Sequence, residues 1–471
     1  MDTIKTDICV IGAGSGGLSV AAGAAQMGAR VVLIEGHKMG GDCLNYGCVP
    51  SKALLAAGKA AAAHRHAFPG VAAHAPEVDF TAAKDHVARV IATIEPHDSQ
   101  ARFESLGVRV IRDWARFTGP DAVEAGGLRI RARRFVIATG SRPFVPPIPG
   151  VDSVPYLTNE SIFDLRAAPG HLLIVGGGPI GLEMAQAHRR LGSKVTVIEG
   201  AKALGRDDPD AAALVLARLR AEGIEIVEGA AVERIGGRAG AIEVQVAGAS
   251  VFMGTHLLMA VGRKPALERL NLAAAGVRTD KGAVAVDDRL RSSNRRVYAI
   301  GDAAGQGQFT HVAGYQAGLI IRPLLFALPA RARNDHIPHV TYTDPELAQI
   351  GPTESEARTR HGDALTVLRL GFDANDRAQA EGKTEGLIKV MAVRGRPVGV
   401  TIAGPAAGEM IGLWSLAIAN RLKLSAIAGS VLPYPTMGEL SKRAAGAYFT
   451  PRLFDNPLIK RVVRMVQRFV P

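Results

Sequence analysis

Two cysteines five positions apart carry the most distinctive chemistry of this sequence. Cys43 and Cys48 lie in the segment Gly-Gly-Asp-Cys-Leu-Asn-Tyr-Gly-Cys-Val-Pro-Ser-Lys of residues 40–52, and the whole chain has only three cysteines. So few cysteines do not form a disulfide framework. We therefore interpret the two as a redox pair that alternates between a disulfide and two thiols.

The spacing of the two cysteines limits the backbone between them. Five residues of regular helix rise about 7.5 Å along the axis, whereas the Cα atoms of bridged cysteines lie within roughly 7 Å. A disulfide between Cys43 and Cys48 therefore requires an interrupted helix, which Gly47 permits. Because Pro50 suits a first helical turn, we expect the pair at the distorted N-terminus of a helix that runs through Lys52. That N-terminus should lower a thiol pKa.

A glycine-rich turn near the start of the chain follows a short apolar strand. The turn, Gly-Ala-Gly-Ser-Gly-Gly of residues 12–17, comes after a predicted strand at 7–11 and before a predicted helix at 18–27. The next predicted strand, at 31–34, ends at Glu35. This is the dinucleotide fingerprint, in which Gly12 allows the tight turn, Gly14 the approach of a pyrophosphate and Gly17 close helix packing. Glu35 is suited to accept ribose hydroxyl groups.

The same pattern recurs in the middle of the chain. Residues 176–181, Gly-Gly-Gly-Pro-Ile-Gly, follow a predicted strand at 172–175, and a later strand at 195–198 ends at Glu199. The equivalent glycines are Gly176, Gly178 and Gly181. Two such modules with a dithiol between them predict one flavin and one nicotinamide. Glu199 favours NADH because it repels the 2′-phosphate of NADPH, although Lys202 and Arg206 leave NADPH open.

The segment of residues 40–52 resembles the redox motif of the pyridine nucleotide-disulfide oxidoreductases, a family that includes dihydrolipoamide dehydrogenase, glutathione reductase and mercuric reductase. The resemblance covers nearly the whole chain. It implies an α/β protein with two Rossmann-like dinucleotide-binding domains, for FAD and NAD, plus an α+β C-terminal dimerisation domain. The boundaries that we expect are 1–149 and 272–337 for the FAD domain, 150–271 for the NAD(P)H domain, 338–450 for the dimerisation domain, and 451–471 for a basic amphipathic tail.

The resemblance also implies roles for individual residues. Cys48 would be the sulfur next to the flavin, Cys43 would engage the substrate, and Lys52 would pair with Glu183 beside the flavin. Asp302 would bind the ribityl chain of FAD, and a helix starting near His311 would direct its N-terminus at the flavin. The other expected cofactor contacts are Gly41, Thr139, Gly140, Gly262, at the end of a predicted strand at 257–262, and Gly301.

Two positions depart from the family pattern. Residues 432–439 read Leu-Pro-Tyr-Pro-Thr-Met-Gly-Glu, so Tyr434 stands where relatives have the histidine that shuttles protons, and Glu439 is the acid that orients that residue. In the homodimer this segment would complete the active site of the partner subunit. A phenol with a pKa near 10 shuttles protons poorly at neutral pH, which disfavours lipoamide or glutathione disulfide as substrate. Asp42, where relatives commonly have threonine, should disfavour the Cys43 thiolate, unless it binds a cationic substrate or faces solvent.

Mercuric reductases, by resemblance, also carry tyrosine at this position. No cysteine follows Cys48, so we expect no C-terminal cysteine pair. We also expect no N-terminal cysteine-containing metal-binding module. We predict a mercuric-reductase-like core that passes electrons from NADH through FAD and the dithiol to a small acceptor, either a disulfide or a soft metal ion. The alternatives are a dihydrolipoamide dehydrogenase and a flavin-containing redox-sensing or membrane-partner protein.

Composition and charge narrow the remaining possibilities. The net charge is +12, but the basic residues are spread along the chain without an aromatic and basic motif, so we expect no nucleic-acid partner. We also expect no bound metal, no signal peptide and no membrane span, and thus a cytoplasmic protein. Residues 458–470 place apolar and basic side chains on opposite sides of a predicted helix. Such a tail fits peripheral contact with a membrane or a partner protein, or packing on its own dimer.

Overall fold

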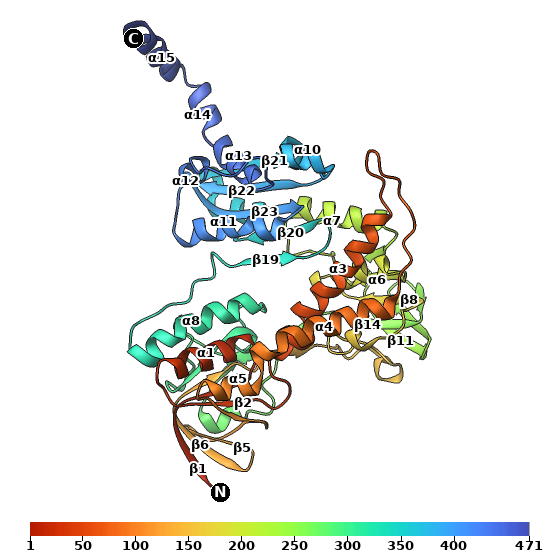
Figure 1. The fold of residues 1–471 in the computed structure, drawn as a ribbon, viewed down its shortest axis with the longest axis vertical. Coiled ribbons are helices and arrows are strands. Elements are labelled where there is room, and N and C mark those ends of the chain that lie inside the picture. The colour runs from red at the N-terminus through yellow and green to blue at the C-terminus, as the bar shows by residue number, and fades with distance from the viewer. Residues whose placement is uncertain (471) are drawn as a thin grey trace. The chain divides into compact units, whose positions relative to one another are not determined.

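The computed structural model of the protein describes residues 1–470 (Figure 1). The chain packs as two compact units. The first unit contains residues 1–177, 184–200 and 230–334, and the second contains residues 178–183, 201–229 and the chain from 335 onward. The glycine turn at residues 12–17 lies in the first unit, and the turn at residues 176–181 is divided between the two units after Gly177. Tyr434 and the tail lie in the second unit.

A seven-stranded sheet forms the centre of the first unit. β1 pairs in parallel with β2 and β6, and β18 pairs in parallel with β6. The strands are β1 (Thr3–Ile11), β2 (Val31–Ile34), β3 (Arg109–Ile111), β4 (Arg116–Gly119), β5 (Ala122–Ala125), β6 (Leu128–Ile137) and β18 (Val297–Ala299). The parallel strands β1 and β2 contain continuous apolar runs that are buried, as expected for strands that are covered on both faces.

Helices cover the seven-stranded sheet and carry the site residues. α1 (Ser15–Gln26) packs beside α8 (Thr310–Phe326), and side chains of both helices join one apolar core (Figure 1). The other helices of this region are α2 (Gly41–Asn45), α3 (Cys48–His64), α4 (Phe80–Asp98) and α5 (Gln100–Ser105). The sheet thus brings the starts of α1 and α8 to its carboxyl edge, where ligands bind in open α/β sheets.

The second nucleotide module repeats the strand arrangement of the first. β8 (His171–Val175) pairs in parallel with β9 (Lys194–Glu199) and β14 (His256–Met259), and α6 (Pro179–Arg190) follows β8. The predicted strand at 257–262 is too long, because β14 ends at Met259 and Gly262 has a φ of +127°, far from the φ of ordinary extended strands. The remaining strands of this unit are β7 (Ser141–Pro143), β11 (Val232–Arg238), β12 (Ala241–Val246), β13 (Val251–Gly254), β15 (Arg263–Pro265), β16 (Thr279–Asp280) and β17 (Ala283–Val284).

The second unit is built on a five-stranded antiparallel sheet in the order β19-β20-β23-β22-β21. Its strands are β19 (Pro338–Thr341), β20 (Glu346–Ile350), β21 (Leu365–Gly371), β22 (Leu387–Val393) and β23 (Arg396–Gly404), and it also contains β10 (Glu225–Glu228). Its helices are α7 (Pro209–Ala221), α9 (Glu354–His361), α10 (Asp376–Glu381), α11 (Ala407–Ala419), α12 (Leu424–Ala428), α13 (Glu439–Ala447), α14 (Thr450–Phe454) and α15 (Pro457–Phe469). The apolar core between the sheet and its helices is centred on the fully buried Trp414.

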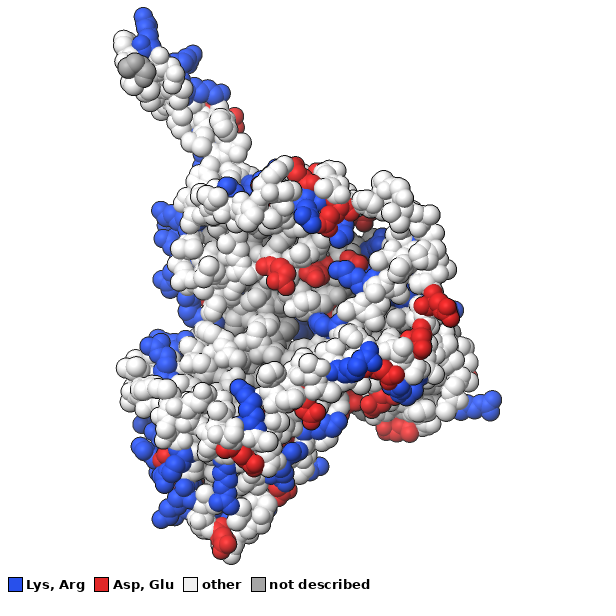
Figure 2. Space-filling view, viewed as in Figure 1, with Lys and Arg blue, Asp and Glu red and all other residues white. Residues whose placement is uncertain are grey.

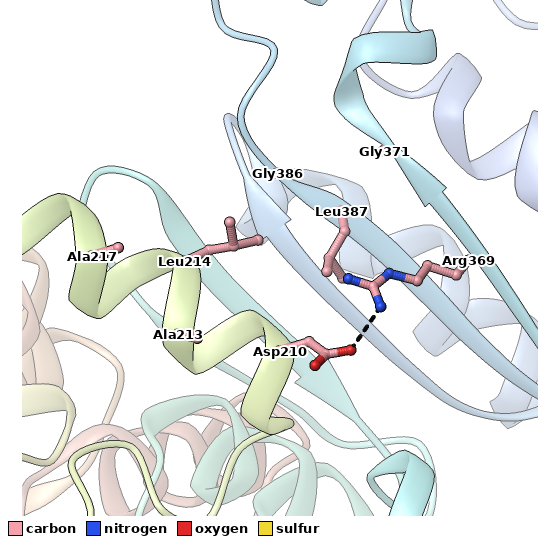
Figure 3. A pocket seen from close by; sticks show the side chains of 8 residues that line it. All are labelled: Asp210, Ala213, Leu214, Ala217, Arg369, Gly371, Gly386 and Leu387. Carbon is pink, nitrogen blue, oxygen red and sulfur yellow. Dashed lines mark hydrogen bonds and ion pairs between the residues drawn. The ribbon is translucent and has the colours of Figure 1, made fainter.

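A shallow pocket in this unit lies between α7 and the strands β21 and β22 (Figure 3). Arg369 and Asp210 face each other across it, with Arg369 Nη1 3.0 Å from Asp210 Oδ2. None of the predicted site residues lines this pocket. Among the described residues 1–470, no helix is both long and apolar enough to cross a bilayer.

Candidate active site

The helix that carries the two cysteines is interrupted between them. Cys43 lies in α2, whereas Cys48 is the first residue of α3, and Gly47 between the helices has a φ of −126° and a ψ of −111°. A Cβ atom on Gly47 would lie 2.8 Å from Asp42 Oδ2 and 3.4 Å from Cys43 Cα, so only glycine fits this close approach. The predicted interruption is confirmed. Both cysteines are free thiols in this structure and hydrogen-bond each other.

The two thiols of the pair differ strongly in acidity. The hydrogen bond from Cys43 lowers the pKa of Cys48 to about 6, with help from Thr310 and from the positive charge of Lys52. The same hydrogen bond raises the pKa of Cys43, and burial and the charge of Asp42 raise it further. At neutral pH Cys48 therefore holds the negative charge and Cys43 keeps the proton. The predicted effect of Asp42 on Cys43 has the expected direction.

Asp42 has partners on two sides. Its Oδ1 atom accepts a hydrogen bond from Arg263 Nη2 at 2.9 Å and another from Asn159 Nδ2 at 2.9 Å. Asp42 is 39% exposed, so it faces solvent in part while these two partners hold it. Neither Arg263 nor Asn159 carried a sequence signal, because both lie more than a hundred residues away along the chain.

The same arginine connects the redox motif to Asp302, the residue expected to bind the ribityl chain of FAD. Arg263 Nε donates to Ser141 Oγ at 2.7 Å, and Ser141 Oγ donates to Asp302 Oδ2 at 2.5 Å. Burial raises the pKa of Asp302 above its ordinary value. Gly301 is fixed in turn by its N–H, which donates to Oε1 of the buried Gln316 at 2.7 Å. A continuous hydrogen-bond path thus runs from Asp42 to Asp302.

The start of α8 meets the cysteine pair. Thr310, the first residue of α8, places its Oγ1 atom 3.3 Å from Cys48 Sγ. His311 follows, with its ring stacked on Phe309 at a centroid distance of 5.3 Å. The sequence predicted a helix beginning near His311, and the structure begins it one residue earlier. The N-terminus of a helix stabilises negative charge, so this arrangement favours the Cys48 thiolate.

The two glycine turns have matching geometry. Gly12 and Gly176 have φ values of +105° and +112°, and a Cβ atom on either would lie 2.4 Å from a carbonyl oxygen, of Ala138 or of Ala260. Both positions therefore require glycine. A Cβ atom on Gly17 would lie 1.8 Å from the Gly12 carbonyl oxygen, which confirms the close packing predicted for that glycine.

The middle glycines of the two turns leave the backbone accessible. A Cβ atom on Gly178 would meet nothing within 4 Å, and one on Gly14 would meet only Gly41 Cα, at 3.9 Å. Gly41 has a φ of +59°, so the redox motif passes next to the first turn at a second glycine. Gly181 lies in the first turn of α6. These features fit the approach of a diphosphate group.

The acids that end β2 and β9 are bound to the turns in the same way. Glu35 Oε2 accepts from the Ala13 N–H at 2.6 Å, and Glu199 Oε2 accepts from the Gly177 N–H at 2.7 Å. A carboxylate oxygen has two lone pairs, so each acid can also accept a ribose hydroxyl group. The internal repeat of the sequence is thus an internal repeat of the hydrogen bonding.

The residues of the first module fit bound FAD. Thr139 Oγ1 is a buried hydroxyl oxygen that has no hydrogen-bond partner among residues 1–470, and buried hydroxyl groups are normally paired. Its neighbour Gly140 has a φ of +66°, at the turn that follows β6. The Thr139 backbone lies against Gly12 of the first glycine turn, and a cofactor bound at that turn would satisfy an unpaired hydroxyl group there. Gly262, the turn residue before β15, accepts the Phe144 N–H through its carbonyl oxygen.

Lys52 and Glu183 lie in different units, and their predicted pairing stays a prediction. Lys52 follows Cys48 by one helical turn and donates to Ser51 Oγ at 3.3 Å. Glu183 is buried and accepts from the Tyr342 N–H at 2.9 Å. The charge of Lys52 also lowers the pKa of Cys48, an effect that the sequence did not predict.

Tyr434 has a partner that the sequence did not indicate. Its hydroxyl donates to Asp376 Oδ2 at 2.9 Å, and the ring is 69% exposed. The carboxylate of Asp376 raises the pKa of Tyr434, and the charge of Glu439 adds to the rise. Glu439 begins α13, and its Oε2 atom is buried without a hydrogen-bond partner in the described part of the chain. Asp376 thus holds the phenol where Glu439 was expected to do so.

Comparison with known proteins places this geometry in a family. Residues 6–317 match the model of the pyridine nucleotide-disulphide oxidoreductases, and residues 337–445 match that of their dimerisation domain. Mercuric reductase from Bacillus cereus is 34% identical over 93% of this chain and 70% of its own length. Dihydrolipoyl dehydrogenase from Thermus scotoductus is 35% identical over 94% of this chain and 97% of its own length.

Solved structures agree with these relatives. The HOCl-induced flavoprotein disulfide reductase RclA from Escherichia coli, as its Cu(II) complex, superimposes with a TM-score of 0.85 at 29% identity, covering 94% of this chain and 99% of that one. LpdA from Mycobacterium tuberculosis gives a TM-score of 0.87 at 25% identity over 94% and 99% of the two chains. The α/β fold with FAD- and NAD-binding modules and a dimerisation domain is confirmed. The chain belongs to the pyridine nucleotide-disulphide oxidoreductase family, whose members bind FAD and take electrons from NAD(P)H.

Proposed function

We propose that this protein is an NADH-dependent reductase of a small soft metal ion, and that it acts through FAD and the Cys43–Cys48 pair as a homodimer. The observation that carries the proposal is the hydrogen bond from Tyr434 to Asp376. Because Asp376 raises the pKa of this phenol, Tyr434 is an even weaker proton shuttle at neutral pH than an ordinary tyrosine. A disulfide substrate needs such a shuttle, whereas a metal ion does not.

The cysteines perform the substrate chemistry. FAD, when bound, accepts hydride from NADH and supplies two electrons to the Cys43–Cys48 disulfide. Cleavage of that disulfide takes up the two electrons and leaves two sulfur atoms that differ in acidity. Cys48 releases its proton, since its pKa is about 6, while Cys43 retains its own. Lys52 and the start of α8 hold the negative charge at Cys48.

A soft metal ion fits this reduced pair. Thiolate sulfur is the ligand type that soft cations prefer, and binding releases the proton that Cys43 holds. For mercury, the net reaction removes a hydride from NADH, transfers its two electrons to Hg(II) and releases one proton. The charge of Asp42 beside Cys43 would add attraction for a cation, although Arg263 partly neutralises it.

The relatives support a metal acceptor. Six of the similar proteins are mercuric reductases from different bacteria, and the similar RclA flavoprotein was solved as a Cu(II) complex. In the proposed homodimer, Tyr434 of each subunit would lie at the metal site of the other. We place the enzyme in the cytoplasm, where a free dithiol persists.

NADH is the proposed electron donor. Glu199 ends β9 with its carboxylate fixed by the Gly177 N–H at 2.7 Å. A fixed carboxylate at this position accepts ribose hydroxyl groups and repels a 2′-phosphate. Steady-state kinetics with both nucleotides test this choice, and a higher kcat/KM for NADPH would contradict it.

A dihydrolipoamide dehydrogenase is the second candidate. The relative from Thermus scotoductus matches over 97% of its own length, a larger share than the 70% of the Bacillus cereus mercuric reductase. That enzyme class needs efficient proton transfer at the thiol pair, which Tyr434 does not favour.

The experiment that separates the two candidates is an acceptor screen with the FAD-loaded protein. NADH oxidation would be followed with Hg(II), Cu(II), lipoamide, glutathione disulfide and oxygen, with Cys43→Ser as the control. The proposal expects Cys43-dependent turnover with a metal ion and little turnover with either disulfide. Rapid Cys43-dependent turnover of lipoamide, without turnover of metal ions, would establish the second candidate instead.

A further inference from the structure

The last helix of the chain, α15, exposes an apolar face to solvent. None of its residues is buried, and the side chains of Leu458, Val462, Met465 and Phe469 are all more than half exposed. In Figure 1 the helix continues from α13 and α14 and lies apart from the five-stranded sheet of its own unit. An apolar face of this size normally packs against something.

The two faces of α15 are cleanly separated. At 100° per residue, the apolar side chains occupy about 160° of the helix circumference, and the charged side chains fall on the opposite side. Every charged residue of the helix is basic: Lys460, Arg461, Arg464 and Arg468. Figure 2 shows these Lys and Arg side chains along the helix. A helix with an apolar face and a basic polar face has the pattern of a helix that lies in the interface of an anionic membrane.

The helix α15 begins at its own N-cap residue. Asn456 caps it, since its Oδ1 atom accepts from the Leu458 N–H at 2.9 Å, and Pro457 occupies the first turn. Its 13 residues rise about 20 Å, which is too short to span a hydrocarbon core of about 30 Å. The geometry therefore suits a helix that lies in the membrane plane.

The tail lies outside the part of the chain that matches the family models. The matched dimerisation domain ends at residue 445, before α14 and α15 begin. The alignment with RclA covers 99% of that protein and 94% of this one, so some residues of this chain have no counterpart there. α14 adds two exposed apolar side chains, Leu453 and Phe454, next to the basic Arg452.

We propose that α15 docks this enzyme on an anionic lipid surface, with its apolar face among the acyl chains and its basic face at the headgroups. Charge complementarity favours lipid as the binding partner of α15. Its polar face has four positive and no negative charges, which matches a surface of anionic headgroups. A second copy of the tail would offer the same positive charges and no complement. Each basic residue near such a surface strengthens binding roughly fivefold.

Vesicle co-sedimentation with the FAD-loaded full chain tests the proposal. The protein should bind vesicles of equal parts phosphatidylglycerol and phosphatidylcholine, bind pure phosphatidylcholine at least tenfold more weakly, and dissociate as salt is raised. Arg464→Glu with Arg468→Glu, and separately Val462→Asp with Val466→Asp, should each weaken binding at least tenfold. Arg238→Glu and Val71→Asp are matched controls, since both residues are exposed and lie outside the tail, and should bind as the unchanged protein does.

Three results would overturn the proposal. One is equal binding by the protein and a form that ends at residue 456. Another is the absence of binding to anionic vesicles at low salt. The third is a change from dimer to monomer in sedimentation velocity when α15 is removed, which would show that a second copy covers the apolar face. Ferricyanide reduction by NADH should be unchanged in all tail variants, which shows that they are folded and hold FAD.

Discussion

Thr310 Oγ1 lies 3.3 Å from Cys48 Sγ, although 262 positions separate the two residues in the chain. The contact brings the first residue of α8 to the first residue of α3. Two helix N-termini thus meet at one sulfur atom, and both favour its negative charge. The contact adds to the hydrogen bond from Cys43, which is the largest influence that lowers the pKa of Cys48.

The Thr310 contact predicts a measurable change in thiol acidity. Thr310→Val removes the hydrogen bond, and the loss of a hydrogen bond to a charged group, about 1.5 kcal/mol, should raise the pKa of Cys48 by about one unit. The thiolate forms above its pKa, which is about 6, so less thiolate should be present in the variant at neutral pH. The ultraviolet absorbance of the thiolate in the reduced protein, followed against pH, measures this shift. Thr310→Ser keeps the hydroxyl group and should titrate as the wild type does; an equal shift in both variants would refute the assignment.

Tyr434→His should create disulfide reductase activity. A histidine with a pKa near 6.5 can exchange protons at neutral pH, whereas Tyr434 cannot, because Asp376 raises its pKa. General acid–base catalysis contributes at least about 100-fold, so kcat/KM for lipoamide should rise by about that factor. Tyr434→Phe should show no such gain. Unchanged lipoamide turnover in the histidine variant would mean that proton transfer at this position is not what limits the enzyme.

Gly17 and Gly318 provide a matched pair of glycines on helices. A Cβ atom on Gly17 would lie 1.8 Å from the Gly12 carbonyl oxygen, whereas one on Gly318 of α8 would meet nothing within 4 Å. Gly17→Ala should therefore cost about 1–3 kcal/mol and weaken FAD retention, and Gly318→Ala should stabilise by up to about 1 kcal/mol. Thermal melting and bound flavin per chain are the measurements. Normal flavin content in Gly17→Ala would show that the turn tolerates the shift.

Lys389 is a buried cation whose ion pairs stabilise the second unit. Its side chain is only 3% exposed, and its Nζ atom lies within 3.0 Å of carboxylate oxygens of Asp208, Asp210 and Glu354. Lys389→Met would leave the fully buried carboxylate of Asp208 without its cation and should cost about 3–5 kcal/mol in the free energy of unfolding. Arg369→Met is the control, because Arg369 is 59% exposed and pairs with Asp210 at the surface, where such pairs contribute about 0–1 kcal/mol.

Acidic pH should reduce the stability that the ion pairs of Lys389 contribute. Lys389 lowers the pKa of Asp210 and of Glu354. A carboxyl group with a lowered pKa contributes stability above its ordinary pKa and loses it as pH falls through the lowered value. Urea unfolding at a series of acidic pH values should show this loss in the wild type and a much flatter profile in Lys389→Met. Identical profiles would contradict the assigned ion pairs.

Local patterns of the sequence predicted the parts of the site that depend on short stretches of chain. The interruption between Cys43 and Cys48 follows from spacing alone, and the turns at Gly12 and Gly176 follow from steric limits on residues other than glycine. The two modules were recognisable because each is one strand, one turn and one helix. The end of β14 was missed, because the apolar run continues for two residues beyond Met259 while the backbone already turns.

Contacts between distant segments could not be predicted in the same way. Arg263, Asn159 and Thr310 reach the redox motif only after the strands and helices have packed. The partner of Tyr434 is equally remote, since Asp376 lies 58 positions earlier, at the start of α10. Thr310 helps to set the acidity of Cys48, and Asp376 sets that of Tyr434, so the acidity of these groups depends on residues that carry no motif.

The central claim is that electrons from NADH reach the Cys43–Cys48 pair. Anaerobic reduction of the oxidised, FAD-loaded protein with NADH, followed by counting thiols with an aromatic disulfide reagent, tests it most directly. Cys9 is fully buried and should stay unreactive. The account predicts that NADH exposes two new thiols in each subunit, and that Cys43→Ser and Cys48→Ser gain none. No increase in the wild type, while NADH still bleaches the flavin, would contradict it.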